Sequence, residues 1–135
     1  MVTLLIGKKG TGKTKKLISL ANEAVAASTG NVVVIEKGSK LTYDVTHKAR
    51  LIDTEQYLIS GYDMLFGFIS GICAGNYDVT DILVDSTFKI CPEALAGLES
   101  FRILPKLHQL TLFSLFLLTK AKFRSQSMLF AEKYN

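Results

Sequence analysis

Eight consecutive residues near the N-terminus constrain this chain more than any other feature. Residues 7–14 read Gly-Lys-Lys-Gly-Thr-Gly-Lys-Thr and fit G-x-x-x-x-G-K-[ST] at every fixed position. The run follows a short apolar strand-like segment, residues 2–6, and precedes apolar residues at helical spacing that begin after Lys13. Because glycine adopts backbone angles that other residues avoid, such a loop can aim several N–H groups at one anion. We therefore expect an anion-binding turn with the N-terminus of a helix behind it.

Two side chains in the run make a triphosphate the expected anion. Lys13 would reach the β- and γ-phosphates, and the Thr14 hydroxyl would hold Mg²⁺. The alternative is a glycine-rich turn in which Lys-Thr occurs by chance, but spacing and context together favour the phosphate site. The candidate nucleotide-binding residues are Gly7, Lys8, Lys9, Gly10, Thr11, Gly12, Lys13, Thr14 and Lys15.

Apolar and β-branched runs predict strands that alternate with helices. The predicted strands are residues 2–6, 31–36, 49–53, 81–85 and 110–118. Helices are predicted from Lys13 to a left-handed cap at Gly30, from Ser60 or Tyr62, from Cys91, and over 127–134. Continuously apolar strands separated by helices favour the α/β class, with a parallel sheet covered by helices on both faces. We find no repeat and no boundary, so we expect one domain over residues 1–135.

Motif and layout together resemble the P-loop NTPase superfamily, specifically over residues 2–27 and more loosely through Asp85. The resemblance implies a three-layer P-loop NTPase-like sheet. It also implies that Asp85 is the Walker B acid, bound to Mg²⁺ through water, with ATP and Mg²⁺ as cofactors and Lys13 and Asp85 as catalytic residues. The alternative for Asp85 is an ordinary carboxylate that caps a strand end or the following turn.

The residue after Asp85 bears on the reaction. GTPases show D-x-x-G after this strand and N-K-x-D for guanine, but here Ser86-Thr87-Phe88 follows and N-K-x-D is absent from the sequence. Many ATPases place a catalytic Glu after or near the Walker B Asp, and Ser86 occupies the first such place. We therefore expect an ATP-binding protein with weak ATPase activity or a switch coupled to a partner. Binding without turnover stays open.

Lys8 supports a second interpretation. The string over residues 8–14 is similar to the deviant Walker A of the ParA/MinD group, K-G-G-x-G-K-[ST]. Lys8 would then reach the phosphates of a partner across a homodimer. Lys9 stands where that group has Gly, and the chain is much shorter than members of the group. The alternative is that these lysines only add positive potential around a phosphate site.

A third interpretation is a small nucleoside or nucleotide kinase. Residues 43–47 and 77–78, ahead of Asp85, loosely resemble thymidine kinase. That family has Asp-Glu after the Walker B strand and a zinc-bearing Cys lasso, whereas Ser86 replaces the Glu here. A site role for the 43–47 segment, including His47, is open beside a plain surface role.

The chain is also similar to small, stand-alone bacterial ATP-binding proteins of clostridial type, which are often labelled twitching-motility (pilus-retraction) ATPases. The shared features are the start at residues 7–15, residues 21–24, 43–44 and 47–48, and the strand that ends at Asp85. The motility label does not carry over, because a pilus-retraction motor is a much longer hexameric enzyme. ATP binding and the fold are what this likeness implies.

Composition limits the cellular compartment and the classes of partner that we expect. Cys73 and Cys91 form neither a disulfide framework nor a zinc spacing, and no stretch approaches the ~20 apolar residues of a membrane span. We therefore expect a cytoplasmic protein whose partners are a nucleoside triphosphate and either a second copy or another protein. Net charge is +4, but the basic residues that cause it are sparse and embedded in Leu and Phe, so nucleic acid is not an expected partner.

Residues 102–126 do not fit the rest of the chain. They contain no acidic residue and no Gly, and a Leu-Phe-Ser-Leu-Phe-Leu-Leu run follows a stretch with weak helical periodicity. One hypothesis is that this segment is read out of frame, which the coding DNA would decide. The alternative is that it is the native, if atypical, end of the domain.

Overall fold

The computed structural model describes residues 2–7, 10–92 and 127–133. The predicted strand at 110–118, the helix expected from Cys91 and the atypical 102–126 segment lie largely or wholly outside these residues. Lys8 and Lys9 also lie outside them, so the ParA/MinD interpretation of Lys8 stays a prediction.

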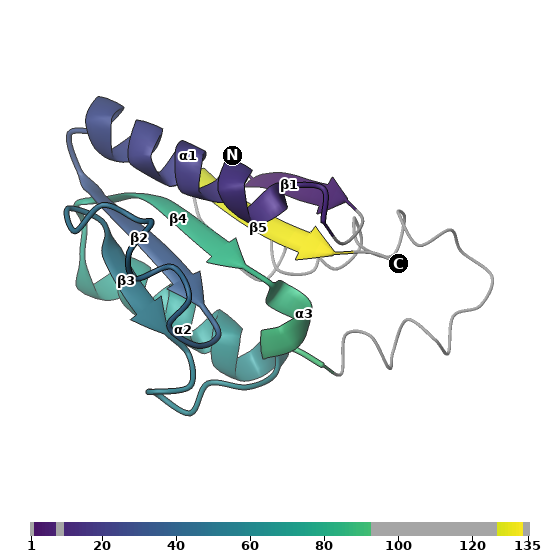
Figure 1. Ribbon diagram of the computed structural model, residues 1–135. Helices are drawn as coiled ribbons and strands as arrows, with labels where there is room; N and C mark the ends of the chain where they lie inside the picture. Colours follow the sequence, from purple (N-terminus) through teal and green to yellow (C-terminus); the bar gives the residue numbers. More distant parts are fainter. Residues whose placement is uncertain (1, 8–9, 93–126, 134–135) are drawn as a thin grey trace.

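The described strands form one open parallel sheet (Figure 1). In spatial order they are β1 (Val2–Gly7), β5 (Ser127–Lys133), β4 (Val79–Asp85), β2 (Asn31–Glu36) and β3 (Arg50–Asp53). With helices between the strands, the molecule is of the α/β class, as the sequence predicts. The first four predicted strands are confirmed, and each contains a short apolar or β-branched run.

The prediction of a helix over 127–134 is wrong, because residues 127–133 form β5, an inner strand between β1 and β4. Ala131 is the register partner of Leu5 on one side and of Asp85 on the other. A strand hydrogen-bonded on both sides satisfies its backbone groups across the sheet, and that pairing outweighs a weak helical pattern. β5 therefore separates the strand that precedes the glycine run from the strand that ends at Asp85.

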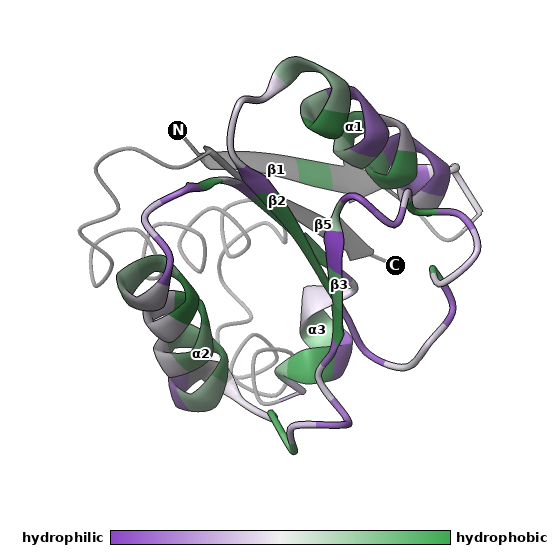
Figure 2. Ribbon diagram, turned by 90° about the vertical axis from the view of Figure 1, so that its left-hand side faces the viewer, coloured by the Kyte–Doolittle hydropathy of each residue, from purple (hydrophilic) through white to green (hydrophobic). Residues whose placement is uncertain are grey.

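Among the described residues, α1 and α2 lie on opposite faces of the sheet (Figure 2). α1 (Lys13–Ala27) packs Leu17 and Ala21 against one face, where Val34 and Leu83 are buried. α2 (Tyr62–Gly75) belongs to the other face. The buried side chains around it are Leu65, Ile69, Val33, Ile35, Ile82 and Val84. Helices on both faces are thus confirmed, and α2 begins at one of the two predicted positions.

Gly30 does not cap α1 in the left-handed conformation that the sequence predicts. The cap position is Ser28, in extended conformation, and the described glycines with positive φ do not include Gly30. Instead, a Cβ on Gly30 would collide with the carbonyl oxygen of Asp78 and the methyl group of Thr80. Close approach of the chain to β4 therefore explains this glycine.

A short helix, α3 (Thr87–Ile90), follows β4 directly and was not predicted. Phe88 and Ile90 of α3 are buried with the α2-side core, as is Cys91, and Cys73 is half-buried on α2. Cys91 therefore belongs to the hydrophobic core, and Cys73 packs against it. Within the described ranges, no helix is both long and apolar enough to cross a membrane.

Candidate functional site

Two residues of the glycine run, Gly10 and Gly12, lie in the left-handed region immediately before α1. Gly10 has φ 83° and Gly12 has φ 81°, values that favour glycine. No heavy atom lies within 4 Å of the position that a Cβ would occupy at either residue, so the backbone angles rather than lack of space require glycine. Gly12 is the N-cap of α1, and its carbonyl accepts the N–H of Lys16 at 3.0 Å. The predicted helix after the glycine run is therefore confirmed, and anion binding by the run stays a prediction.

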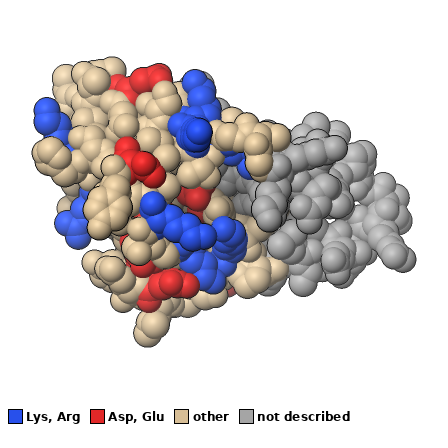
Figure 3. Space-filling model, viewed as in Figure 1, with Lys and Arg blue, Asp and Glu red and all other residues tan. Residues whose placement is uncertain are grey.

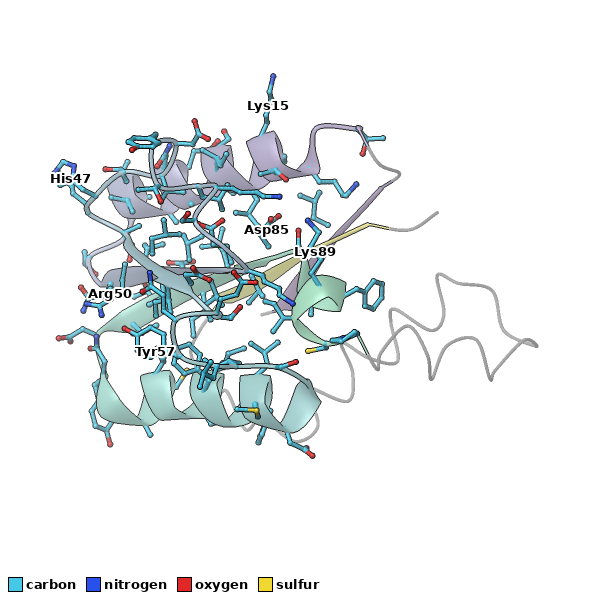
Figure 4. The ribbon with its side chains drawn as sticks, turned by 60° about the horizontal axis from the view of Figure 1, so that its bottom comes forward. Lys15, His47, Arg50, Tyr57, Asp85 and Lys89 are labelled. Atoms are coloured by element: carbon cyan, nitrogen blue, oxygen red, sulfur yellow. The ribbon has the colours of Figure 1, made fainter. Side chains whose placement is uncertain are left out.

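The side chains at the start of α1 add positive charge to that turn. Lys13 is half-buried, with its Nζ 3.4 Å from Oγ1 of Thr11. Thr14 is exposed, and the first turn of the helix carries no acidic residue that would neutralise its positive end. Lys15 extends away from the sheet edge that holds Asp85 (Figure 4), so the geometry does not bring its side chain to Asp85.

Asp85 ends β4 on the face of the sheet that α1 covers. Side chains alternate along a strand, and Leu83, two residues earlier, packs in the α1-side core. The half-buried Asp85 carboxylate accepts a hydrogen bond from Oγ of Ser86 through its Oδ2, at 2.9 Å. Because α1 runs back over parallel strands, its N-terminus and Asp85 lie at the same, carboxyl edge of the sheet (Figure 1).

Two further carboxylates, which the sequence analysis did not single out, extend this edge. Glu36 ends β2 and Asp53 ends β3, and the two are register partners. Val34 and Leu51, two residues before them, pack in the α1-side core, so both acids point to the same face as Asp85. In the order β4, β2, β3, the carboxylates form a row. The available sequence signal was that three predicted strands each end on an acid.

Glu36 is buried, at 2% exposure, and its carboxylate is bound by backbone N–H groups of the following turn. Oε2 accepts from Lys40 at 3.1 Å, and Leu41 donates to both oxygens at 3.1 and 3.2 Å. Burial raises the pKa of Glu36 above its usual value, and these backbone hydrogen bonds oppose the rise. The neighbouring charges of Asp53 and Asp85 raise the pKa further.

Asp53 holds the same turn from the next strand. Its Oδ1 accepts the N–H of Gly38 at 2.8 Å and that of Glu55 at 2.9 Å. Gly38 has φ 90°, which allows the chain to reverse at this point. Glu36 and Asp53 therefore use their carboxylates to fix the turn after β2.

Two lysines lie beside the carboxyl ends of β2 and β4. Nζ of Lys37, on the turn after β2, donates to the carbonyl oxygen of Lys89 in α3 at 3.0 Å. Figure 4 shows Lys89 and Asp85 on the same side of the sheet edge, at the ends of α3 and β4. Figure 3 shows a group of basic side chains near the middle of the viewed face, with acidic side chains beside it.

The 43–47 segment lies away from this edge. Asn22, in the second half of α1, accepts the N–H of Thr46 at 3.0 Å and donates to the carbonyl of Asp44 at 3.4 Å. Tyr43 is 98% exposed, and His47 is exposed and distant from Asp85 (Figure 4). The structure therefore does not bring these residues to the glycine run.

The acids of the carboxyl edge do not by themselves form a metal site among the described residues. Over the described ranges, no group of three or more His, Cys, Asp or Glu side chains could hold a metal ion alone. Magnesium commonly keeps several waters and binds through one or two protein oxygens plus substrate phosphates. Thr14 is exposed and Asp85 is half-buried, and the expectation that they hold Mg²⁺ stays a prediction.

Comparison with known proteins adds no family assignment. The scan against protein-family models matches none, and the search of curated proteins finds no significant match.

Proposed function

We propose that this chain binds Mg·ATP through residues 7–14 and acts as a weak ATPase or a nucleotide-dependent switch. One observation carries the proposal: Gly10 and Gly12 adopt left-handed angles directly before the N-terminus of α1. Left-handed residues that alternate with other conformations, followed by a helix N-terminus, can turn successive backbone N–H groups toward one point, where they bind phosphate oxygens.

The surrounding groups support a triphosphate with magnesium. Lys13 is the first residue of α1 and would contact the β- and γ-phosphates. Thr14 and Asp85 would hold Mg²⁺, which would neutralise phosphate charge when bound. These assignments make the site a P-loop site, and the α/β sheet with helices on both faces is compatible with a P-loop NTPase fold.

We propose slow turnover because the carboxylates at the ends of β4, β2 and β3 already have other partners or roles. Hydrolysis is fast when a carboxylate is free to orient or deprotonate the attacking water. Of the carboxylates in the row, Glu36 and Asp53 both accept backbone hydrogen bonds, and Asp85 is assigned to magnesium. No carboxylate in the row is thus left for water, which favours a switch or a slow enzyme.

The melting temperature with and without Mg·ATP tests the proposal. A ligand at 100 times its Kd adds about 2.7 kcal/mol to stability. For a domain of this size, that corresponds to a rise of roughly 10 °C. We expect the rise in wild type and in Lys48→Ala, an exposed lysine beside His47, but not in Lys13→Ala. A folded wild type that shows no rise would refute nucleotide binding.

A further inference from the structure

We infer that Ser86 is a positioning residue that orients Asp85 for Mg²⁺. The inference rests on the proposed function and names a further residue of the same site. It starts from a backbone outlier: Ser86 has φ 55° and ψ 48°, in the left-handed region. In the described part of the chain, Leu58 is the one other non-glycine residue with positive φ. Side chains rarely adopt this conformation, and when they do the residue is often part of a functional site.

The hydroxyl of Ser86 is used in an unusual way for its position. Ser86 is the N-cap of α3, where a serine side chain ordinarily accepts a backbone N–H from the first turn of the helix. Here it makes no such cap hydrogen bond, and Oγ donates instead to Oδ2 of Asp85 at 2.9 Å. Helix capping therefore does not explain the serine, whereas orientation of the carboxylate does.

The strained backbone and this hydrogen bond act together. The left-handed angle at Ser86 ends β4 and starts α3 at once, with the N–H of Lys89 donating to the Ser86 carbonyl at 2.8 Å. The turn places the hydroxyl beside the carboxylate of the preceding residue. A donor on Oδ2 fixes the plane of the Asp85 carboxylate and leaves Oδ1 for a water of the metal shell. Partners that orient a metal-binding group in this way tune metal affinity.

Substitutions at residue 86 can separate the effect of its hydroxyl from the effect of its left-handed backbone angle. Glycine accepts the left-handed angle without strain but supplies no hydroxyl, so Ser86→Gly removes the hydrogen bond and preserves the turn. Leu58→Gly is the matched control, because Leu58 has φ 54° and is 81% exposed. Both substitutions relieve the same backbone strain, and we expect neither to lower the melting temperature.

The test is a titration of Mg²⁺ against binding of a fluorescent ATP analogue, with metal-free binding measured in EDTA. We expect Ser86→Gly to raise the Mg²⁺ concentration at half-effect by about tenfold. Metal-free binding should stay at the wild-type value, and Leu58→Gly should match wild type in both. In an Asp85→Ala background, Ser86→Gly should have no further effect, because the group that it orients is gone.

The possible outcomes distinguish failure of the Ser86 positioning role from failure of nucleotide binding. An unchanged Mg²⁺ midpoint in Ser86→Gly, with binding intact, overturns the positioning role and leaves nucleotide binding standing. An equal rise in Leu58→Gly also overturns it, because relief of strain would then be the cause. Absence of any binding by folded wild type, with or without Mg²⁺, refutes the proposed function and this inference together.

Discussion

Glu36 and Asp53 are register partners at the carboxyl ends of neighbouring strands, and both hold the turn that follows β2. The Glu36 carboxylate accepts the N–H groups of Lys40 and Leu41, at the end of the turn. The Asp53 carboxylate accepts the N–H of Gly38, near the start of the turn. The turn is thereby fixed from two strands, and it carries Lys37, which reaches α3. These hydrogen bonds connect the ends of β2 and β3 with α3, at the carboxyl edge beside Asp85.

The free energy of unfolding should depend on pH through Glu36. Burial, Asp53 and Asp85 raise the pKa of Glu36 in the folded protein above the unfolded value of 4.5. Between those two values the folded state binds more protons than the unfolded chain, so the Glu36 contribution to stability falls as pH rises. We expect wild type to lose stability relative to Glu36→Gln as pH rises through this window, measured by urea unfolding at stepped pH.

An Asp53→Asn background provides the control. The amide keeps an oxygen for the N–H of Gly38 but removes one of the charges that raise the pKa of Glu36. The pH-dependent difference between Glu36 and Gln at position 36 should therefore shrink. A difference that grows in favour of wild type with rising pH would contradict the prediction.

Alanine at Gly12 and at Gly67 should change stability in opposite directions. Both sites have open space for a Cβ, but Gly12 has φ 81° whereas Gly67 lies inside α2. Gly12→Ala should cost about 1–2 kcal/mol because of the left-handed angle. Gly67→Ala should gain up to about 1 kcal/mol, because alanine favours the helix. Chemical denaturation measures both, and equal effects would show that backbone angle does not distinguish the two sites.

Gly30→Ala should be among the more damaging alanine substitutions in the chain. The new methyl group would meet the Asp78 carbonyl oxygen, which also accepts the N–H of Asn31, so a shift there disturbs the start of β2. We expect a loss of about 1–3 kcal/mol, the range for forced overpacking. Gly71→Ala, in open space on α2, is the control. A Gly30→Ala protein as stable as wild type would show that the strands can separate at this point without cost.

Local patterns predicted most of the fold through residue 92. The β-branched run before Glu36 and the apolar run before Asp85 predicted β2 and β4, and the spacing after Lys13 predicted α1. These signals are local, since burial of a strand or of one helix face shows in the order of apolar residues. The site was predicted only in part: the glycine turn and Asp85 were singled out, whereas Glu36 and Asp53 were not.

The sequence by itself determined that three glycines, three lysines and two threonines stand where a strand passes into a helix, because that information lies within eight residues. Only the tertiary structure decided that β5 lies between β1 and β4, and that the acids of β4, β2 and β3 form one row. Strand order depends on pairing between segments far apart in the chain, which periodicity does not encode. The hydrogen bond from Ser86 to Asp85 likewise depends on a backbone angle that the packed end of β4 imposes.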